Sequence, residues 1–434
     1  MQKLKNFPQI SALINRHKDL PEALSSFFAK EVTKKLKERA KSGETVDKED
    51  IFLAMDERVR LYKSRQIRPL INATGIALHT NLGRALISKK TWQELEPLMT
   101  SHVNLEFDCD NISRGSRFSC LEDDLKALFN SPGFAVNNNA SAVFLILHTL
   151  CDTVLTSRSE LVEIGGSFRM PEVIKASGVE LIELGTSNKT HLKDYQAALE
   201  QIPKDKRVII LKTHRSNFIQ QGFVSEVDVF TLQALAQKAG ATFYYDLGAG
   251  FVDNFGSETS IKELAAKGLD LLSFSADKLF ASTQAGIILG QNTLIESLKK
   301  AQIARMLRLD KIALALLSKA LKAHMQKDYK ALPSLALLLS SPEEIKEKAL
   351  ELKELCGFGQ VVESKAPTGA GSLPGLLLKS YSLAFSKDIK PLQKAFLEKG
   401  VLGRVHKDMF LLDLRAVLPN ELEALAKIIC EVLK

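Results

Sequence analysis

Short apolar runs that alternate with helix-length segments most constrain the fold of this 434-residue chain. The runs are ELVEIGG from Glu160, VELIELGT from Val179, RVIILKTH from Arg207, ATFYYDLG from Ala241, DLLSFSADK from Asp270 and AGIILG from Ala285. Segments such as FTLQALAQKAG and ETSIKELAAKG separate most of them and end in glycine, as helices often do. This alternation predicts an α/β fold with a largely parallel sheet covered on both faces. The last two runs are too close for a helical crossover, so we expect them to pair through a loop.

The pattern divides the chain into three regions. Residues 1–66 are predicted to form a helical domain, with helices at Glu22–Ala40 and Lys48–Lys63 and a helix cap at Thr45 or Asp47. Residues 67–324 carry the α/β pattern. Residues 325–434 are predicted to form a smaller α/β domain that contains the strand-like runs VLGRV and MFLLDLR.

The composition is that of an ordinary soluble protein, with 45% hydrophobic and 25% charged residues. No apolar run approaches the roughly 20 residues that a membrane span needs, and the N-terminus lacks a secretory signal pattern. The five cysteines form no CxxC pair, so we expect reduced thiols packed as small hydrophobic groups, with neither a disulfide framework nor a metal site. These features predict a cytoplasmic protein without a membrane partner.

The N-terminal region carries most of the chain's net charge of +8. Residues 1–70 contain 16 Lys and Arg against 10 Asp and Glu, whereas the other 364 residues contribute only about +2. This asymmetry favours an anionic partner, of which nucleic acid is the first candidate. The alternative is a solvated helical face.

Two polar residues end neighbouring apolar runs and are the first candidates for chemistry. Asp246 ends FYYD, and Lys278 follows SFSAD. Ligands of open α/β sheets bind beyond the carboxyl ends of the strands. Pyridoxal phosphate requires such a pair, since a lysine forms the Schiff base and a carboxylate keeps the pyridine nitrogen protonated. A Schiff-base aldolase would not need Asp246, and separately the two residues could be a helix cap and a surface lysine.

A phosphate site is predicted at VNNNASAVFLILHTL, where a small polar turn directly precedes an apolar helix. Backbone N–H groups at a helix start bind anions. We therefore expect the cofactor's phosphate near Asn139, Ala140 and Ser141, with a further hydroxyl from Ser275.

Motifs spread over nearly the whole chain resemble those of the bacterial selenocysteine synthase family, the L-seryl-tRNA(Sec) selenium transferases. The resemblance is densest between residues 69 and 312. It is carried by INATGIALHTNLGRALIS from Ile71, HVNLEFD from His102, RGSRFS from Arg114, KTHRSNF from Lys212, DLGAG from Asp246, SFSADKLFASTQAGIILG from Ser273, RMLRLDKIALALL from Arg305 and GAGSLPG from Gly369.

This resemblance implies an aspartate-aminotransferase-like fold (fold type I), with Lys278 as the lysine that binds pyridoxal 5′-phosphate and Asp246 as its pyridinium partner. It implies that Arg84, Arg305 and Arg308 hold selenophosphate, a tetrahedral anion that guanidinium groups match well. Arg305 and Arg308 are expected to share a helix face. His79 is either a ligand-contacting or a structural histidine.

The implied reaction converts seryl-tRNA(Sec) to selenocysteinyl-tRNA(Sec). Lys278 removes the Cα proton, water leaves from Cβ, and selenium adds to the dehydroalanyl intermediate. The resemblance also implies a tRNA-binding N-terminal domain and a homo-oligomer built from dimers, with a decamer favoured. DNA is not expected as a partner.

Several positions depart from the family pattern. Ala276 replaces a glycine, Phe280 a leucine and Ala281-Ser282-Thr283 the sequence Gly-Gly-Pro, while Ala249 replaces a serine and Arg215 a small residue. Loss of a glycine matters where the backbone needs a conformation that a Cβ disfavours. Ser282 and Thr283 could instead offer hydroxyls to a phosphate. The alternatives are therefore a lyase or β-eliminase acting on a free small amino acid, a diverged transferase of reduced activity, and a silent tRNA-binding protein.

Overall fold

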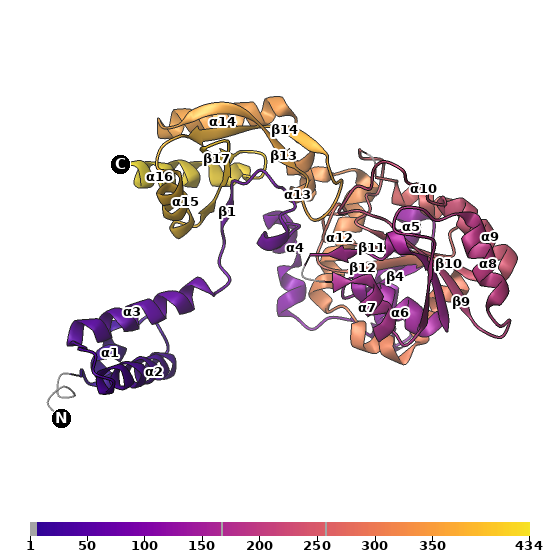
Figure 1. Cartoon of the computed structure of the whole chain (residues 1–434), viewed down its shortest axis with the longest axis horizontal. Coiled ribbons are helices and arrows are strands. Elements are labelled where there is room, and N and C mark those ends of the chain that lie inside the picture. Colours follow the sequence, from indigo (N-terminus) through magenta and orange to yellow (C-terminus); the bar gives the residue numbers. More distant parts are fainter. Residues whose placement is uncertain (1–6, 166–167, 257) are drawn as a thin grey trace. The chain divides into compact units, whose positions relative to one another are not determined.

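The computed structural model describes residues 7–165, 168–256 and 258–434. The chain divides into two compact units, and the boundary in the sequence falls between Pro69 and Leu70 (Figure 1). The first unit ends three residues later than the predicted boundary at residue 66. The further division predicted after residue 324 falls in the last turn of helix α12 (Lys311–Gln326), and it stays a prediction.

The N-terminal unit is a small helical bundle with its own core. It contains α1 (Ile10–Arg16), α2 (Glu22–Lys41) and α3 (Lys48–Ser64). The last two confirm the predicted helices, and Asp47 caps α3 by accepting a 2.8 Å hydrogen bond from the Asp50 backbone N–H. The core is formed by apolar side chains from all three helices: Leu13, Phe28, Ala29, Val32, Leu36, Ile51, Met55 and Val59.

A seven-stranded sheet forms the centre of the second unit. Its strand order is β4 (Gly133–Val136), β12 (Gly286–Gly290), β11 (Leu271–Ser275), β10 (Thr242–Gly248), β9 (Val208–Thr213), β5 (Thr153–Ser157) and β8 (Glu180–Leu184). Only β12 runs antiparallel to its neighbours, so the expected largely parallel sheet is confirmed, as is the pairing of β11 with β12 through a loop.

One predicted strand is wrong. The run from Glu160 contributes only β6 (Glu163–Ile164), which pairs with β7 (Phe168–Arg169) outside the main sheet. The main-sheet strand of this region is β5, whose five residues are all buried.

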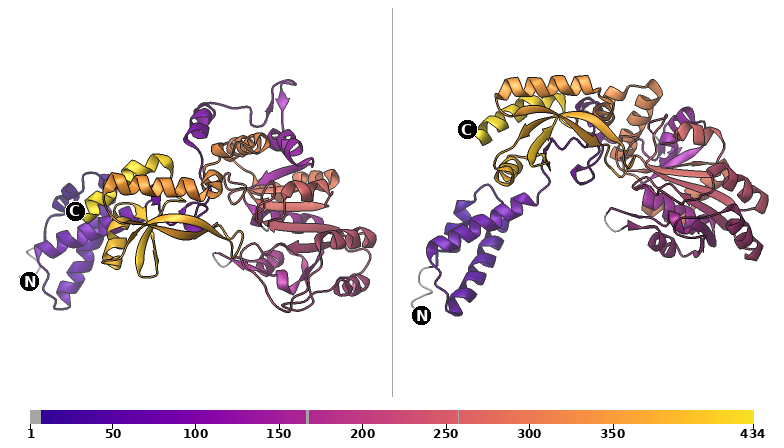
Figure 2. Two further views of the ribbon diagram at one scale, coloured as in Figure 1. Left: turned by 90° about the horizontal axis from the view of Figure 1, so that it is seen from above. Right: turned by 45° about the horizontal axis from the view of Figure 1, so that its top comes forward.

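Helices cover both faces of the sheet, as the views in Figure 1 and Figure 2 show. One face packs against α6 (Asn139–Leu150), α7 (Met170–Ala176) and α11 (Asn292–Lys300). The other packs against α5 (Glu122–Phe129), α8 (Leu192–Gln201), α9 (Val229–Ala239), α10 (Ile261–Ala266) and α12. Strand side chains alternate between the two cores, with Leu211 and Tyr244 facing α6. Two residues further along each strand, Thr213 and Asp246 face the same side.

A second, antiparallel sheet lies in the C-terminal part of this unit. Its order is β13 (Gln360–Pro367), β14 (Leu377–Phe385), β17 (Met409–Asp413) and β16 (Arg404–His406), and it packs with α14 (Pro342–Cys356), α15 (Ile389–Glu398) and α16 (Leu422–Leu433). β1 (Ile71–Asn72) pairs with β15 (Val401–Leu402) beside it. Gly75 packs closely against Asp413 at the end of β17. A Cβ at Gly75 would lie 2.5 Å from Cγ of this buried residue, which leaves no room for a larger side chain.

The remaining elements of this unit include β2 (Phe107–Asp108), β3 (Ser113–Arg114), α4 (Lys89–Thr100) and α13 (Pro333–Leu339). All five cysteines are unpaired. Cys151 and Cys356 are buried as expected, but Cys109 and Cys120 are exposed, so packing as small hydrophobic groups is wrong for these two. No helix in the described part of the chain is long and apolar enough to cross a membrane.

The loop that joins β11 to β12 is folded back on itself by backbone hydrogen bonds. Ala281 N donates to the Lys278 carbonyl and Ser282 N to the Ala276 carbonyl, both at 2.8 Å. Ala281 adopts a left-handed conformation with φ +56°. A Cβ makes this conformation unfavourable, so Ala281 stores strain where the family pattern has a glycine.

A buried histidine supports the same loop from α12. His324 Nε2 lies 2.8 Å from the Phe280 carbonyl oxygen, and the two rings pack with centroids 4.4 Å apart. Since a carbonyl only accepts, Nε2 carries the hydrogen. Burial lowers the pKa of His324 to about 4, and the hydrogen bond to Phe280 opposes this only in part.

We expect Ala281→Gly to raise the free energy of unfolding by about 1 kcal/mol, because glycine adopts the left-handed conformation without strain. Ala276→Gly is the matched control, since Ala276 also replaces a family glycine but is not left-handed. Glycine there should cost about 0.5 to 1 kcal/mol. Urea unfolding of the two variants measures both effects, and equal changes in both would contradict strain at Ala281.

Neutral His324 should make the folded state sensitive to acid. Its folded pKa is depressed below the unfolded value of 6.5, so the unfolded chain binds more protons between the two values. The stabilising contribution is complete above pH 6.5 and is lost, by about 3 kcal/mol, as the pH falls to about 4. His324→Gln should therefore weaken the pH dependence of the urea midpoint in this window, whereas His102→Gln, at an exposed site, should leave it unchanged. An unchanged slope in His324→Gln would refute this.

Candidate functional site

A cavity of about 250 Å³ lies at the carboxyl ends of the central strands. Six predicted site residues line it together: Arg84, Asn139, Ala140, Asp246, Ser275 and Lys278. They come from β10, β11, the loop after β11, the start of α6 and the segment before α4. The sheet therefore brings together, at one edge, residues that are almost 200 positions apart in the sequence. This agrees with the rule that ligands bind beyond the carboxyl ends of the strands.

Asp246 is buried at the base of this cavity, with only 4% of its surface exposed. Oδ1 accepts hydrogen bonds from Asn139 Nδ2 at 2.7 Å and from Gly248 N at 3.1 Å. Burial raises the pKa of Asp246, while the bond from Asn139 and the charge of Lys278 oppose that shift. The two donors and the nearby ammonium thus favour the ionised carboxylate in a dry setting.

Lys278 reaches the same cavity from the loop after β11. Its Nζ donates to the Gly248 carbonyl at 3.3 Å. Burial lowers the pKa of Lys278, and the charge of Asp246 opposes this. A lowered pKa makes the neutral amine more available as a nucleophile and base.

Arg84 faces Lys278 and is held by the neighbouring carboxylate. Arg84 Nη1 donates to Asp277 Oδ2 at 2.7 Å, and Asp277 is buried. This hydrogen bond orients the guanidinium, and Arg84 is the arginine of the predicted three that lines the described cavity.

The other two predicted arginines lie elsewhere. Gln302–Leu307 is a short 3₁₀ helix, and Arg308 follows it in extended conformation, so the expectation that Arg305 and Arg308 share one helix face is wrong. Arg308 Nη1 lies 3.4 Å from Glu106 Oε1, and Arg305 is exposed. Neither is among the described residues that line the cavity. Their role toward selenophosphate stays a prediction.

Ser141 and His79 act as parts of local turns. Ser141 N donates to Asn138 Oδ1 at 2.9 Å, which caps α6, and Ser141 does not contribute to the described cavity wall. His79 Nδ1 accepts from Asn81 N at 3.2 Å, which favours the structural alternative for this histidine. Ser282 is buried and lines a separate cavity beside α4 and α12, so a phosphate role in the Lys278 cavity is not supported for its hydroxyl.

Sequence reasoning missed a group of residues at the end of β9 and directly after it. Thr213, His214, Ser216 and Asn217 line the cavity beside Asp246. His214 N donates to the Asp246 carbonyl at 2.8 Å, and its ring contacts Tyr245 OH at 3.3 Å. The run RVIILKTH ends at this point, so the logic that selected Asp246 could have selected these residues as well.

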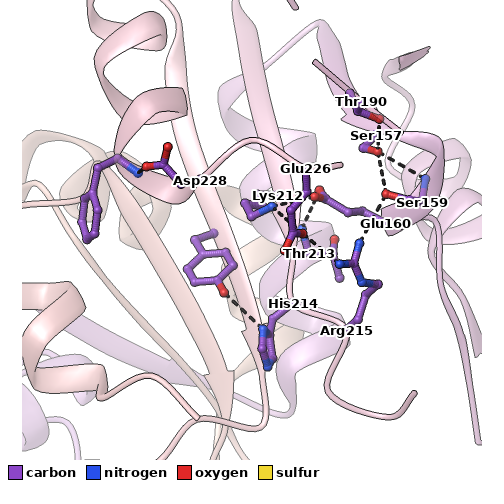
Figure 3. Close-up of polar contacts among 12 residues, drawn as sticks. Ser157, Ser159, Glu160, Thr190, Lys212, Thr213, His214, Arg215, Glu226 and Asp228 are labelled. Carbon is purple, nitrogen blue, oxygen red and sulfur yellow. Dashed lines mark hydrogen bonds and ion pairs between the residues drawn. The ribbon is translucent and has the colours of Figure 1, made fainter. Parts of the chain in front are cut away.

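Arg215, the bulky departure in the same motif, is not among the described residues that line the cavity, and Figure 3 shows its polar contacts. Its Nη2 donates to Glu226 Oε2 at 2.9 Å and its Nη1 to Ser159 Oγ at 3.4 Å. Because the guanidinium is used in these contacts, the large side chain leaves the cavity open beside His214.

The described cavity fits pyridoxal phosphate on its own chemistry. It holds an amine, a buried carboxylate and the N-terminal turn of α6 with its backbone N–H groups. Two buried polar atoms among its lining residues, Asn139 Oδ1 and Thr213 Oγ1, have no hydrogen-bond partner in the described chain. Such orphaned atoms are expected where a polar ligand completes the site.

Comparison with solved structures confirms the predicted fold. The chain is similar to the structure of D-glucosaminate-6-phosphate ammonia-lyase, with a TM-score of 0.60, 15% identity, and coverage of 86% of this chain and 97% of that one. At this identity the likeness concerns the fold alone.

Comparison with sequences is more specific. The L-seryl-tRNA(Sec) selenium transferase of Campylobacter jejuni strain 81116 is 44% identical over 99% of both chains. That of Wolinella succinogenes is 39% identical, again over 99% of both chains. A family model described as L-seryl-tRNA selenium transferase matches residues 70–418. The resemblance found in the motifs is thereby confirmed, together with pyridoxal phosphate as the predicted cofactor, and the chain belongs to the L-seryl-tRNA selenium transferase family.

Proposed function

We propose that this protein is a pyridoxal-phosphate-dependent L-seryl-tRNA(Sec) selenium transferase that uses selenophosphate to convert seryl-tRNA(Sec) to selenocysteinyl-tRNA(Sec). The observation that carries the proposal is the shared cavity of Lys278 and Asp246 in a chain that belongs to this family. When bound there, pyridoxal phosphate supplies an electron sink for the charge that develops on the substrate's Cα.

The residues of the cavity have separate tasks in this reaction. Lys278, whose pKa is lowered by burial, would hold the cofactor, and after the seryl amino group has displaced it, its free amine would take the proton from the seryl Cα. Asp246 keeps a proton on the pyridine nitrogen, and Asn139 fixes the carboxylate for that purpose. Arg84, oriented by Asp277, offers a guanidinium to the selenophosphate anion.

The assembly is proposed to be a homo-oligomer built from dimers, in the cytoplasm. The segment after Asn217 carries exposed apolar side chains at Phe218, Ile219 and Phe223, the last with 82% of its surface exposed. Exposed apolar groups so close to a cavity support a contact with a second copy of the chain.

The N-terminal unit is proposed to bind the tRNA through α2. Lys30, Lys34, Lys37 and Lys41 are exposed and follow one another at three or four residues, so they share one helix face. None of the four forms a salt bridge with a described residue. A row of ammonium groups without salt bridges to described residues matches the phosphates of an RNA backbone.

Lys278→Ala should abolish the visible absorption of the cofactor-loaded protein and lower selenium transfer at least about a thousandfold, because anchor and base are lost together. The assay incubates pure protein with seryl-tRNA(Sec) and selenophosphate and identifies the amino acid released from the tRNA. Lys262→Ala, at a partly exposed lysine outside the cavity wall, is the control and should behave as wild type.

Two other outcomes would contradict the proposal, and each would favour a different alternative function. A wild-type protein that absorbs in the visible but converts only free serine would be a lyase. A protein without visible absorption would be a silent tRNA-binding member of the family.

Replacing the α2 row by glutamine (Lys30, Lys34, Lys37 and Lys41) should weaken tRNA(Sec) binding and reduce the salt slope of log K by up to about 3 to 4 units. The control replaces four basic residues that already form salt bridges: Arg16, Arg39, Arg58 and Arg60. It removes the same charge but should change the slope less. Equal slopes for the two variants would assign the effect to net charge alone. The salt slope of log K is measured for each variant by filter binding between 50 and 200 mM salt.

A further inference from the structure

We propose that Thr213 is a further cofactor-binding residue, whose side-chain hydroxyl donates a hydrogen bond to the 3-oxygen of pyridoxal phosphate. The inference rests on the proposed function, because it places the cofactor by Lys278 and Asp246. It concerns the side of the cavity formed by the end of β9, for which the sequence predicted no role.

The order of the strands decides which edge of the cofactor faces β9. With the ring nitrogen at Asp246 on β10, the phosphate lies toward the α6 turn and the Ser275 hydroxyl at the end of β11. β9 and β11 lie on opposite sides of β10. The phosphate-bearing carbon and the 3-oxygen are on opposite sides of the axis through the ring nitrogen and the carbon that Lys278 attacks. The 3-oxygen therefore faces the end of β9.

Thr213 is the residue of β9 in the right place for this contact. It pairs in register with Asp246, and its side chain points to the α6 side of the sheet, as that of Asp246 does. It is buried, with 4% of its surface exposed, and it lines the cavity. Its Oγ1 has no hydrogen-bond partner in the described chain. A buried hydroxyl left without a partner loses free energy unless a ligand supplies one.

Two neighbouring side chains of the cavity wall, those of His214 and Asn217, already make polar contacts. His214 Nδ1 lies 3.3 Å from Tyr245 OH, and its Nε2 lies 3.4 Å from Glu258 Oε2. Asn217 Nδ2 donates to the Glu163 carbonyl at 3.2 Å. Ser216 also offers a hydroxyl to the cavity, but it lies after the end of β9. Thr213 is the residue of β9 that pairs in register with Asp246, and its buried hydroxyl has no hydrogen-bond partner among the described residues.

A buried ion pair holds Thr213 from behind (Figure 3). Lys212 Nζ donates to Glu160 Oε1 at 2.8 Å, and Glu160 Oε2 accepts from Thr213 N at 3.2 Å. Both side chains of the pair are almost fully buried. Glu160 therefore holds the backbone N–H of Thr213, and this contact does not use the Thr213 hydroxyl.

A donor at this position changes a property of the loaded protein that can be measured without turnover. A hydrogen bond to the 3-oxygen favours its anionic form. If the donor is lost, the anionic form is less stable. The proton next to the 3-oxygen should then be lost only at a higher pH. The charged and titratable groups that line the same cavity (Arg84, His214, Asp246 and Lys278) are left unchanged, so a shift reports on the hydroxyl alone.

The experiment follows the visible absorption band of the cofactor-loaded protein as a function of pH. Thr213→Val removes the hydroxyl but keeps the shape, and it should raise the midpoint by about 0.5 to 1 pH unit. Thr213→Ser keeps a hydroxyl and should leave the midpoint near that of wild type. Thr156→Val is the matched control, because Thr156 has a buried, unpartnered hydroxyl on β5 and does not line the described cavity.

Two results would overturn the inference: an unshifted midpoint in Thr213→Val, or an equal shift in Thr156→Val. If Thr213→Val does not take up the cofactor, Thr213→Ala is compared with wild type for binding pyridoxal phosphate and its 3-deoxy analogue. For each protein, the affinity for pyridoxal phosphate is divided by the affinity for the 3-deoxy analogue. This ratio should be about fivefold larger for wild type than for the variant, and equal ratios would refute the contact. A wild-type protein without a visible band would instead refute the proposed function.

Discussion

The hydrogen bond between Asn139 Nδ2 and Asp246 Oδ1 joins the two halves of the site. Asn139 begins α6, and Asp246 ends β10, so this contact sets the distance between the anion-binding turn and the strand ends. A buried carboxylate at the end of a central strand is costly unless its oxygens are satisfied. Asn139 and Gly248 N satisfy one oxygen, and the other side of the carboxylate is left for a cationic partner. Every role assigned to Lys278, Ser275 and Thr213 depends on this fixed point.

Chain order explains why the site is built from distant residues. The antiparallel β12 returns the chain beside β4, so the loop after β11 and the turn before α6 meet at one edge of the sheet. That loop holds Lys278, and it keeps its shape through a left-handed Ala281 and the buried His324. The strain at Ala281 is tolerated because hydrogen bonds within the loop and the contact from α12 over-determine its path.

The sequence predicted the residues whose position follows from local pattern. Asp246 and Lys278 end apolar runs, and Asn139 starts an apolar helix, so strand-end and helix-start rules place all three. Arg305 and Arg308 were misplaced because their spacing suits an α-helix, whereas the chain there forms a 3₁₀ turn followed by an extended residue. The misassigned strand at Glu160 has a similar cause. Its apolar residues lie after β5, where Glu160 turns inward to meet Lys212, a contact between residues 52 positions apart that no local pattern contains.

The same buried charges explain how this chain accommodates its departure at Arg215. Glu160 and Lys212 form one pair, and Glu226 lies within 3.4 Å of Lys212 and 2.9 Å of Arg215. Two acidic and two basic groups therefore balance on the side of β9 that faces away from the cofactor cavity. A cation that would block the cavity if it pointed inward is drawn outward by Glu226, and the residues on either side of it, His214 and Ser216, keep their places in the cavity wall. The departure thus alters the support of the cavity and leaves its lining intact.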